Sequence, residues 1–252
     1  MTAGMIDVIR HGRVALVTLR RPPANALNIE LTEEIASVFQ VLGQDEDVRS
    51  VVLTGHGKSF CAGVDLKIVP TFDQGDQRRM VNALNHAFYS VYACPVPVVG
   101  AINGHAIAGG LILVLCCDWR IASKTPFLAG LTEVRVGVPY PVAAMAVARH
   151  ELRPEIARRL VLFGENVASA AAVDAGVFDQ AVDAAALLQR ALVKAEEFAA
   201  LPQVAFAQTK RQLRSRAVET MAAAMAGEEP LLDTWLSRQT IAAAASVLTG
   251  KA

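Results

Sequence analysis

Short apolar runs alternate with helical segments in the first half of the chain, and this order constrains the fold more than any other feature. Val48–Thr54 and Val98–Ile102 are rich in β-branched residues, which indicates short buried strands. From Pro141 onward the pattern is almost all helical and very rich in alanine. Strands and helices in repeating order, followed by helices, predict an α/β core with a helical C-terminal region.

Local signals mark the first elements. Ile6–Arg10 and Val14–Leu19 alternate apolar and polar residues around a His-Gly pair, which predicts a β-hairpin. Asn28 is suited to cap the next helix, because its side chain can accept a hydrogen bond from an N–H of the first turn. The polar stretch Thr71–Arg79 predicts a mobile surface segment, and a helix is expected over Met80–Tyr92.

The later segments are expected to form an apolar helix over Gly109–Cys117 and a strand over Trp119–Ala122. A Leu201-Pro202 pair separates two long helices near the C-terminus, because proline interrupts helical hydrogen bonding. We therefore expect an α/β core over residues 1–195 and a helical C-terminal region over residues 196–252.

The charge balance excludes some classes of protein. The chain has 24 basic and 24 acidic side chains, so it lacks the basic surplus of a nucleic-acid-binding protein. Charged residues make up 19%, against about 25% in typical soluble domains, which indicates apolar surface covered by a subunit, a ligand or a membrane. The longest apolar stretch, Ala106–Cys117, is far shorter than the ~20 residues that span a bilayer, so no membrane span is expected.

The cysteines and histidines do not form a metal-binding pattern, so no metal site is predicted. The four cysteines contain no Cys-x-x-Cys pair, and the five histidines are scattered. Reduced, buried thiols are typical of a cytoplasmic protein, and Met1–Arg10 contains no apolar run typical of a signal peptide. The cysteines are Cys61, Cys94, Cys116 and Cys117.

Two loops of small residues follow predicted buried strands and carry the main chemical signal. They are Ser59–Leu66 and Asn103–Gly110. Small side chains allow a ligand to approach the backbone closely, and backbone N–H groups can then point at an anion. Two N–H groups that converge on one oxygen would form an oxyanion hole for an enolate or a tetrahedral adduct.

These two loops, together with the Cys-Asp-Trp-Arg-Ile-Ala segment at 117–122, resemble the crotonase (enoyl-CoA hydratase/isomerase) superfamily over about residues 6–215. The resemblance implies a spiral of ββα repeats with a C-terminal helical region that forms trimers, so a homotrimer or hexamer is expected. It also implies that the N–H groups of Val64 and Gly109 form the oxyanion hole and bind the thioester oxygen of an acyl-CoA.

The same resemblance indicates which carboxylates would transfer a proton to or from the substrate. Hydratases of the superfamily use two glutamates, and one of these positions is Ile112 in this chain, whose aliphatic side chain cannot orient water. The other position, in a Gly-x-x-Glu setting, is Glu133. A single carboxylate can take a proton from C2 and return it at C4, and this arrangement resembles the Δ3,Δ2-enoyl-CoA isomerase branch.

Substrate contacts follow from the resemblance as well. Coenzyme A enters as part of the substrate, and no separate cofactor is expected. Arg21, Lys67 and Lys210 are candidates for the phosphates, and Lys67–Phe88 is expected to supply the acyl pocket. The residues expected to bind substrate are Ala24, Ala26, Ala62, Gly63, Asp65, Leu66, Gly110 and Ile112.

Two other functions stay open at this stage. A 2-enoyl-CoA hydratase would need a second carboxylate, which Asp73 or Asp76 could supply from the polar segment. A protein that binds acyl-CoA without turnover would keep the two loops, and the missing carboxylate at Ile112 is compatible with it. Glu133 argues against this non-catalytic alternative.

Overall fold

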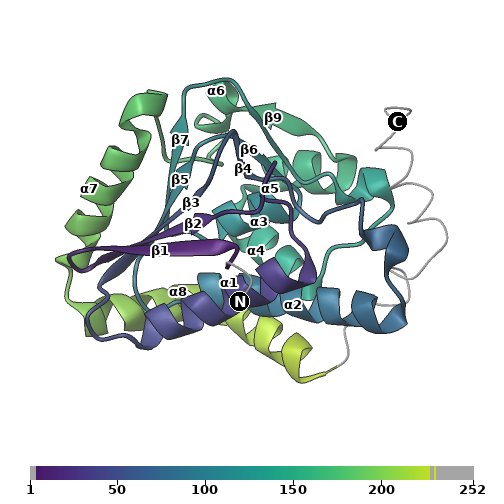
Figure 1. The fold of residues 1–252 in the computed structure, drawn as a ribbon, viewed down its shortest axis with the longest axis horizontal. Helices are drawn as coiled ribbons and strands as arrows, with labels where there is room; N and C mark the ends of the chain where they lie inside the picture. Colours follow the sequence, from purple (N-terminus) through teal and green to yellow (C-terminus); the bar gives the residue numbers. More distant parts are fainter. Residues whose placement is uncertain (1–3, 228–229, 231–252) are drawn as a thin grey trace.

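The computed structural model describes residues 4–227 and 230, which form two sheets with helices around them (Figure 1). The strands of the six-stranded sheet, in spatial order, are β1 (Ile6–His11), β2 (Val14–Leu19), β3 (Ser50–Gly55), β5 (Val98–Ile102), β7 (Trp119–Ser123) and β10 (Gln180–Val182). The strands of the four-stranded sheet are β4 (Ser59–Cys61), β6 (His105–Ile107), β8 (Leu128–Gly130) and β9 (Asn166–Ala168).

The chain crosses between the two sheets three times in the same way. β3, β5 and β7 are parallel neighbours in the large sheet, and each continues directly into β4, β6 or β8 of the small sheet. A helix follows each pair of strands. This repetition is the predicted spiral of ββα units, so the predicted α/β fold class is confirmed.

Helices α1 to α4 cover one face of the six-stranded sheet and α7 covers the other, and the bounds of the α-helices follow in chain order. They are α1 (Ile29–Gln44), α2 (Gln74–Tyr92), α3 (Gly109–Leu115), α4 (Val142–Glu151), α5 (Pro154–Ala157), α6 (Ser169–Ala172), α7 (Leu187–Ala199) and α8 (Gln203–Ala226). The predicted cap is confirmed, because the Asn28 side chain accepts the N–H of Leu31 at the start of α1.

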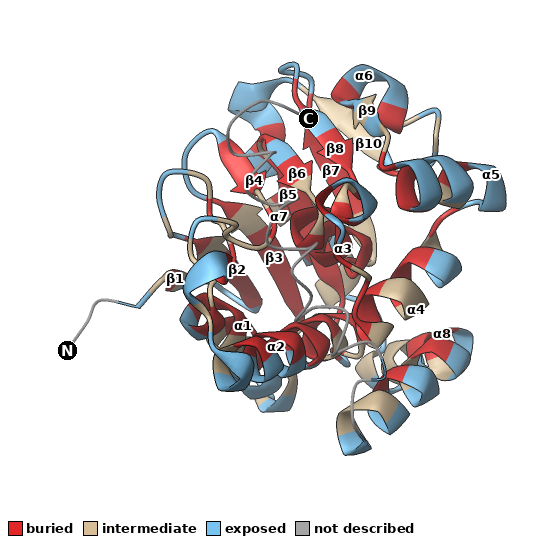
Figure 2. Cartoon of the chain, turned by 90° about the vertical axis from the view of Figure 1, so that its right-hand side faces the viewer, coloured by how far each residue is buried: buried red, intermediate tan, exposed pale blue. Residues whose placement is uncertain are grey.

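Burial on both faces of the central strands explains why they are continuously apolar. Along β3, Val51 and Leu53 face the large core shared with α1 to α4, while Val52 faces the smaller core beneath α7. The smaller core also contains Ala191 and Ala195 of α7. Figure 2 shows the central strands β3, β5 and β7 and the inward sides of the helices as mostly buried, with the outer sides of α5 and α6 exposed.

Two predictions about local structure are wrong. The polar stretch 71–79 is not an irregular mobile segment, because α2 already begins at Gln74 and Asp73 caps it by accepting the N–H of Asp76 at 2.8 Å. Asp73 caps the helix, Arg78 and Arg79 lie on its exposed side, and Gln77 is buried. The region after Pro141 is not all helical either, because β9 and β10 add short strands at the sheet edges, and three residues are too few to show periodicity.

The Leu201-Pro202 break is confirmed between α7 and α8. The predicted boundary between residues 195 and 196 falls inside α7. Part of the predicted C-terminal region, residues 228–229 and 231–252, lies outside the described residues.

Buried ion pairs attach α8 to the sheet. Lys210 and Arg214 contact the carboxylate of Asp118 at 2.7 and 3.1 Å, and both cationic side chains are nearly inaccessible to solvent. Asp118 also accepts the N–H of Val98, at the start of β5, at 2.8 Å. Arg214 reaches Glu151 at the end of α4, at 3.4 Å. Asp118 therefore connects the sheet to the C-terminal helix.

We expect Asp118→Asn to lower the free energy of unfolding by about 3–5 kcal/mol, because the neutral amide leaves two buried cations short of their counter-charge. Urea unfolding followed by circular dichroism measures the loss. Asp7→Asn is the matched control, since Asp7 pairs with Arg20 at the exposed surface and its removal should cost less than about 1 kcal/mol. Equal losses in the two variants would contradict this role of Asp118.

Candidate active site

The two small-residue loops lie against each other where the sheets meet. A Cβ atom on Gly63 would lie 3.2 Å from the backbone nitrogen of Gly109, and a Cβ on Gly109 would lie 3.9 Å from the Cα of Gly63. The two glycine backbones are therefore in contact. This contact brings the N–H group of Val64, the residue after Gly63, to the same part of the molecule as that of Gly109.

The backbone of both loops is held in conformations that expose these N–H groups. Gly63 has φ +76°, which strains residues with a Cβ. Ala108 has φ +52° and donates its N–H to Gly130 at 2.7 Å. Gly109 is the first residue of α3, so its N–H has no acceptor within the helix. Among hydrogen bonds between described residues, neither the Val64 nor the Gly109 N–H is a donor, so both are available to an oxygen atom of a ligand.

A cavity of about 210 Å³ begins at these loops. Its wall is almost entirely apolar and is formed by the two loops, α2, the segment around η2 (Glu133–Val136) and the start of α4. The predicted site residues that line it are Ala62, Val64, Leu66, Gly109 and Glu133.

Glu133 is the one ionisable side chain among the described residues that line this cavity. It is 8% exposed, and its Oε2 has no hydrogen-bond partner among the described residues. Burial raises the pKa of Glu133 from 4.5 to about 7, against the opposing effects of its own backbone N–H and the Tyr140 hydroxyl. At neutral pH both protonation states are populated, as suits a group that accepts and returns a proton.

Two side chains that hold the Glu133 segment were not predicted. The Tyr140 hydroxyl donates to the carbonyl oxygen of Leu131 at 3.0 Å. The Arg135 side chain donates to the carbonyl oxygen of Gly164 at 2.7 Å, which joins η2 to the segment before β9. Neither residue belongs to a motif, so nearness to Glu133 in the sequence is the only signal that could have marked them.

Gly110 and Ile112 lie behind the cavity rather than in its wall. A Cβ on Gly110 would lie 2.0 Å from the carbonyl oxygen of Cys61, so the glycine allows α3 to pack directly on β4. Ile112 is fully buried in the large core. Their expected contacts with substrate stay predictions.

Ala24, Ala26 and Asp65 support the first loop from its outer side. The carbonyl oxygen of Ala24 accepts the N–H of Ala62 at 3.1 Å. Arg21 donates to the carbonyl oxygen of Ala26 at 2.9 Å and pairs with the Asp65 carboxylate at 2.8 Å. Asn25, which the sequence interpretation missed, is buried between them. Asn25 donates to the carbonyl oxygens of residues 56, 59 and 60.

Lys210 is wrong as a candidate for the coenzyme A phosphates, because it is buried and its charge is paired with Asp118. Arg21 and the exposed Lys67 remain the candidates. Neither Asp73 nor Asp76 lines the cavity with Glu133.

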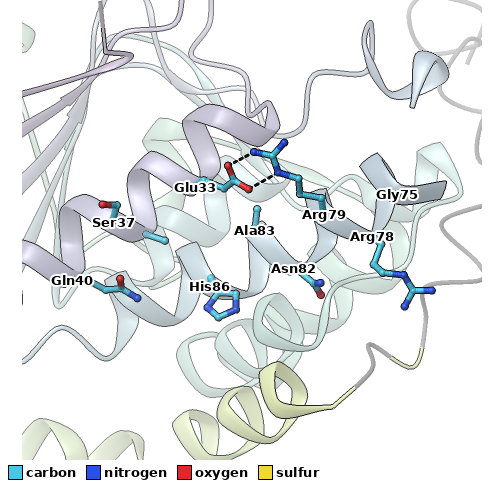
Figure 3. Close-up of a pocket in the computed structure, with 10 residues that line it drawn as sticks. Glu33, Ser37, Gln40, Gly75, Arg78, Arg79, Asn82, Ala83 and His86 are labelled. Atoms are coloured by element: carbon cyan, nitrogen blue, oxygen red, sulfur yellow. Dashed lines mark hydrogen bonds and ion pairs between the residues drawn. The ribbon is translucent and has the colours of Figure 1, made fainter. Parts of the chain in front are cut away.

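A larger groove of about 460 Å³ lies between α1 and α2, away from the predicted site (Figure 3). Its walls carry polar side chains, and Glu33 pairs with Arg79 across it at 2.6 Å. Its α2 wall, from Gly75 to His86, belongs to the Lys67–Phe88 segment that was expected to supply the acyl pocket, but neither small-residue loop nor Glu133 lines it. The smaller cavity is therefore the candidate site, since its wall combines the two loops with the buried carboxyl of Glu133.

The described residues show neither a metal-binding cluster nor a membrane-spanning helix. Residues 4–227 contain no cluster of three or more His, Cys, Asp or Glu side chains placed to hold a metal ion. Within the same part of the chain, no helix has the length and apolar character needed to cross a bilayer.

Comparisons with known proteins agree with one another. The family model described as "Enoyl-CoA hydratase/isomerase" matches residues 10–247. A probable mitochondrial enoyl-CoA hydratase of Dictyostelium discoideum is 31% identical over 207 residues, which cover 82% of this chain and 74% of that protein. The structure of a probable enoyl-CoA hydratase of Mycobacterium tuberculosis is similar with a TM-score of 0.82 and 28% identity, over 88% of this chain and 94% of that one. Human mitochondrial delta3-delta2-enoyl-CoA isomerase shares the fold with a TM-score of 0.92 at 24% identity, over 98% and 97% of the two chains.

The burial of Glu133 predicts a pH-dependent cost in stability. Between pH 4.5 and about 7 the folded protein keeps a proton that the unfolded chain has lost, so the free energy of unfolding falls as pH rises through this range, by about 3 kcal/mol in total. We expect Glu133→Gln to remove this fall. Relative to wild type, the variant should therefore gain stability between pH 5 and pH 8 in urea unfolding.

Glu155→Gln is the control, because the Glu155 carboxylate is exposed at the surface. Its stability relative to wild type should not change between pH 5 and pH 8. Parallel pH profiles of wild type and Glu133→Gln would show that the carboxyl is not buried as described.

Proposed function

The chain belongs to the enoyl-CoA hydratase/isomerase family, and we propose that it is an isomerase that moves a double bond of an acyl-CoA from the 3 to the 2 position. The observation that carries this proposal is the carboxyl of Glu133, the one ionisable group among the described residues that line the apolar cavity. It lies with the N–H groups of Val64 and Gly109, which donate no hydrogen bond between described residues. The substrate brings its own coenzyme A, and the proposal needs no further cofactor.

In this mechanism the N–H groups of Val64 and Gly109 donate hydrogen bonds to the thioester oxygen. Glu133 removes a proton from C2, and the negative charge that develops on the thioester oxygen is stabilised by the two donors. The protonated Glu133 then gives the proton back at C4, and the double bond forms between C2 and C3. No atom is gained or lost, so one carboxyl is enough.

Hydration of a 2-enoyl-CoA is the second candidate, because similar proteins are named hydratases. Addition of water to C3 is helped by a second carboxylate that orients the water molecule. Among the described residues, the cavity offers only Glu133, and Ile112 is buried behind it. This difference favours isomerisation over hydration.

We expect Glu133→Gln to lower the rate of 3-enoyl-CoA isomerisation about 100- to 10,000-fold, because the amide cannot accept the C2 proton. Conversion to the conjugated 2-enoyl product, followed by its absorbance, measures the rate. In the wild type, the rate should rise with pH to a plateau with a midpoint near pH 7, where Glu133 becomes ionised.

Asp73→Asn and Asp76→Asn are the controls, and both should isomerise at the wild-type rate. Isomerisation by Glu133→Gln at the wild-type rate would refute the proposed mechanism. Rapid formation of 3-hydroxyacyl-CoA from 2-enoyl-CoA would support the hydratase. Tight binding of acyl-CoA without turnover of any enoyl isomer would support a non-catalytic binding protein.

We also propose that the protein acts in the cytoplasm as a homotrimer or hexamer. Exposed apolar side chains support a covered surface, among them Leu162 and Phe163, which are 62% and 59% exposed at the end of η3 (Arg158–Leu162). Light scattering of the purified protein should give three or six times the chain mass of 26.8 kDa. A monomer mass would contradict the assembly.

A further inference from the structure

The buried side chain of Tyr140 lies where three segments of the site region meet. Its hydroxyl donates to the carbonyl oxygen of Leu131, two residues before Glu133, at 3.0 Å. It also reaches the carbonyl oxygen of Val161 in η3 at 3.4 Å. The side chain is 6% exposed. Tyr140 thereby joins the segment that carries Glu133 to η3 and to the start of α4.

The carboxyl of Glu133 is poorly supplied with hydrogen-bond donors for a buried acid. Its Oε2 atom has no hydrogen-bond partner among the described residues. The Tyr140 hydroxyl lowers the pKa of Glu133 against the larger effect of burial, and the charge of Glu133 in turn helps to raise the pKa of Tyr140. These reciprocal effects place the hydroxyl and the carboxyl close to each other.

Charged side chains on the neighbouring elements do not take the place of this hydroxyl. Among the described residues, no charged side chain of α2 or of the two loops lines the cavity with Glu133. On η2, Arg135 donates to the carbonyl oxygen of Gly164. On η3, Arg158 is exposed and Arg159 pairs with Glu165 at 2.8 Å.

The other side of Tyr140 lines a groove between α4 and α8. The charged or titratable side chains that line this groove are the exposed Arg149, His150 and Arg216. The pKa of Tyr140 nevertheless responds to burial and to Glu133, and not to these three groups. The electrostatic partner of Tyr140 among the described residues is therefore Glu133.

A tyrosine hydroxyl has a single hydrogen to donate, so it serves its neighbouring oxygen atoms in turn. While Glu133 carries a proton, the hydroxyl donates to the carbonyl oxygen of Leu131. An ionised carboxylate is a stronger acceptor than a carbonyl oxygen, because hydrogen bonds to a charged group are shorter and stronger. Rotation of the O–H bond then redirects the hydrogen to Glu133, and the aromatic ring does not have to move.

We propose that Tyr140 is a positioning residue for proton transfer, which holds the Glu133 segment through Leu131 and donates its hydroxyl hydrogen to Glu133 whenever that carboxyl is ionised. Tyr140 does not line the cavity, so it acts through Glu133 and not on the substrate. The inference rests on the proposed function for the reaction that it serves. The hydrogen bond itself is formed without a substrate.

Tyr140→Phe removes the hydroxyl and keeps the ring. Infrared difference spectroscopy of the ligand-free full chain follows the carbonyl band of the protonated Glu133 carboxyl as pH rises, and Glu133→Gln identifies this band by its loss. We expect the midpoint to rise by about one pH unit from its wild-type value near 7, because the ionised form loses its hydrogen bond. An unchanged midpoint would overturn the proposal.

Tyr92→Phe is the matched control. Tyr92 is also buried and donates to a carboxylate, that of Glu151, at 2.9 Å, but it does not line the candidate cavity. The infrared midpoint of Glu133 in this variant should equal that of the wild type. A rise as large as in Tyr140→Phe would show that any lost tyrosine hydroxyl has this effect, which contradicts the proposal.

Replacement of Tyr140 by a fluorotyrosine tests the opposite direction. The fluorine makes the hydroxyl more acidic and therefore a stronger donor, so the midpoint of Glu133 should fall below the wild-type value. General destabilisation cannot lower the midpoint in one protein and raise it in the other. Shifts in the same direction for both substitutions would overturn the assignment of the hydrogen bond.

The rate of isomerisation gives an independent measurement. At pH 7, Tyr140→Phe should isomerise about fivefold more slowly than the wild type, because a smaller fraction of Glu133 is ionised, and at pH 9 the two rates should agree within about twofold. An equal loss at both pH values would indicate a merely structural role and overturn the proposal. Infrared shifts as expected, in a wild-type protein that isomerises no enoyl-CoA, would support the contact between Tyr140 and Glu133 and refute the proposed reaction.

Discussion

The close contact between successive ββα units is the constraint on which the rest of the structure depends. β4 and β6 pair in parallel, and α3 packs on β4 so closely that a Cβ on Gly110 would lie 2.0 Å from the carbonyl oxygen of Cys61. Glycine alone permits this approach. The same contact places Gly63 against Gly109, and thereby the N–H groups of Val64 and Gly109, which donate no hydrogen bond between described residues, in the wall of an apolar cavity. The contacts that pack successive ββα units together are thus the same contacts that form the candidate site.

Burial of polar groups serves two purposes in this molecule. Asp118, Lys210 and Arg214 neutralise one another, so that α8 can be held against the sheet without leaving an isolated charge. Among the described residues that line its cavity, Glu133 has no cation beside it, and burial raises its pKa to about 7. When this buried carboxyl is ionised, above neutral pH, it lowers the free energy of unfolding. Such a loss of stability is expected for a group whose pKa is suited to proton exchange.

Strong local signals made much of the fold predictable. The hairpin, the Asn28 cap, the buried strands and the break before α8 each depend on neighbouring residues or on simple periodicity. The sequence motifs also brought Val64, Gly109 and Glu133 into one candidate site, and all three line the cavity. The strands β9 and β10 were missed because each has three residues and is defined by its partner in the sheet.

The sequence by itself determined the repeating order of strands and helices and the small-residue loops, because these are properties of residue type and spacing. That one carboxylate stands where hydratases have two is what the resemblance to the crotonase superfamily implied. Only the tertiary structure decided which charged side chains are buried in ion pairs and which are accessible to a ligand. Lys210 has the sequence character of a phosphate ligand, yet it is buried on Asp118, 92 residues away along the chain. It also decided that Leu84 of α2 and Ala144 of α4 line the same cavity as the two loops. Such contacts depend on the packing of distant segments, which residue spacing does not encode.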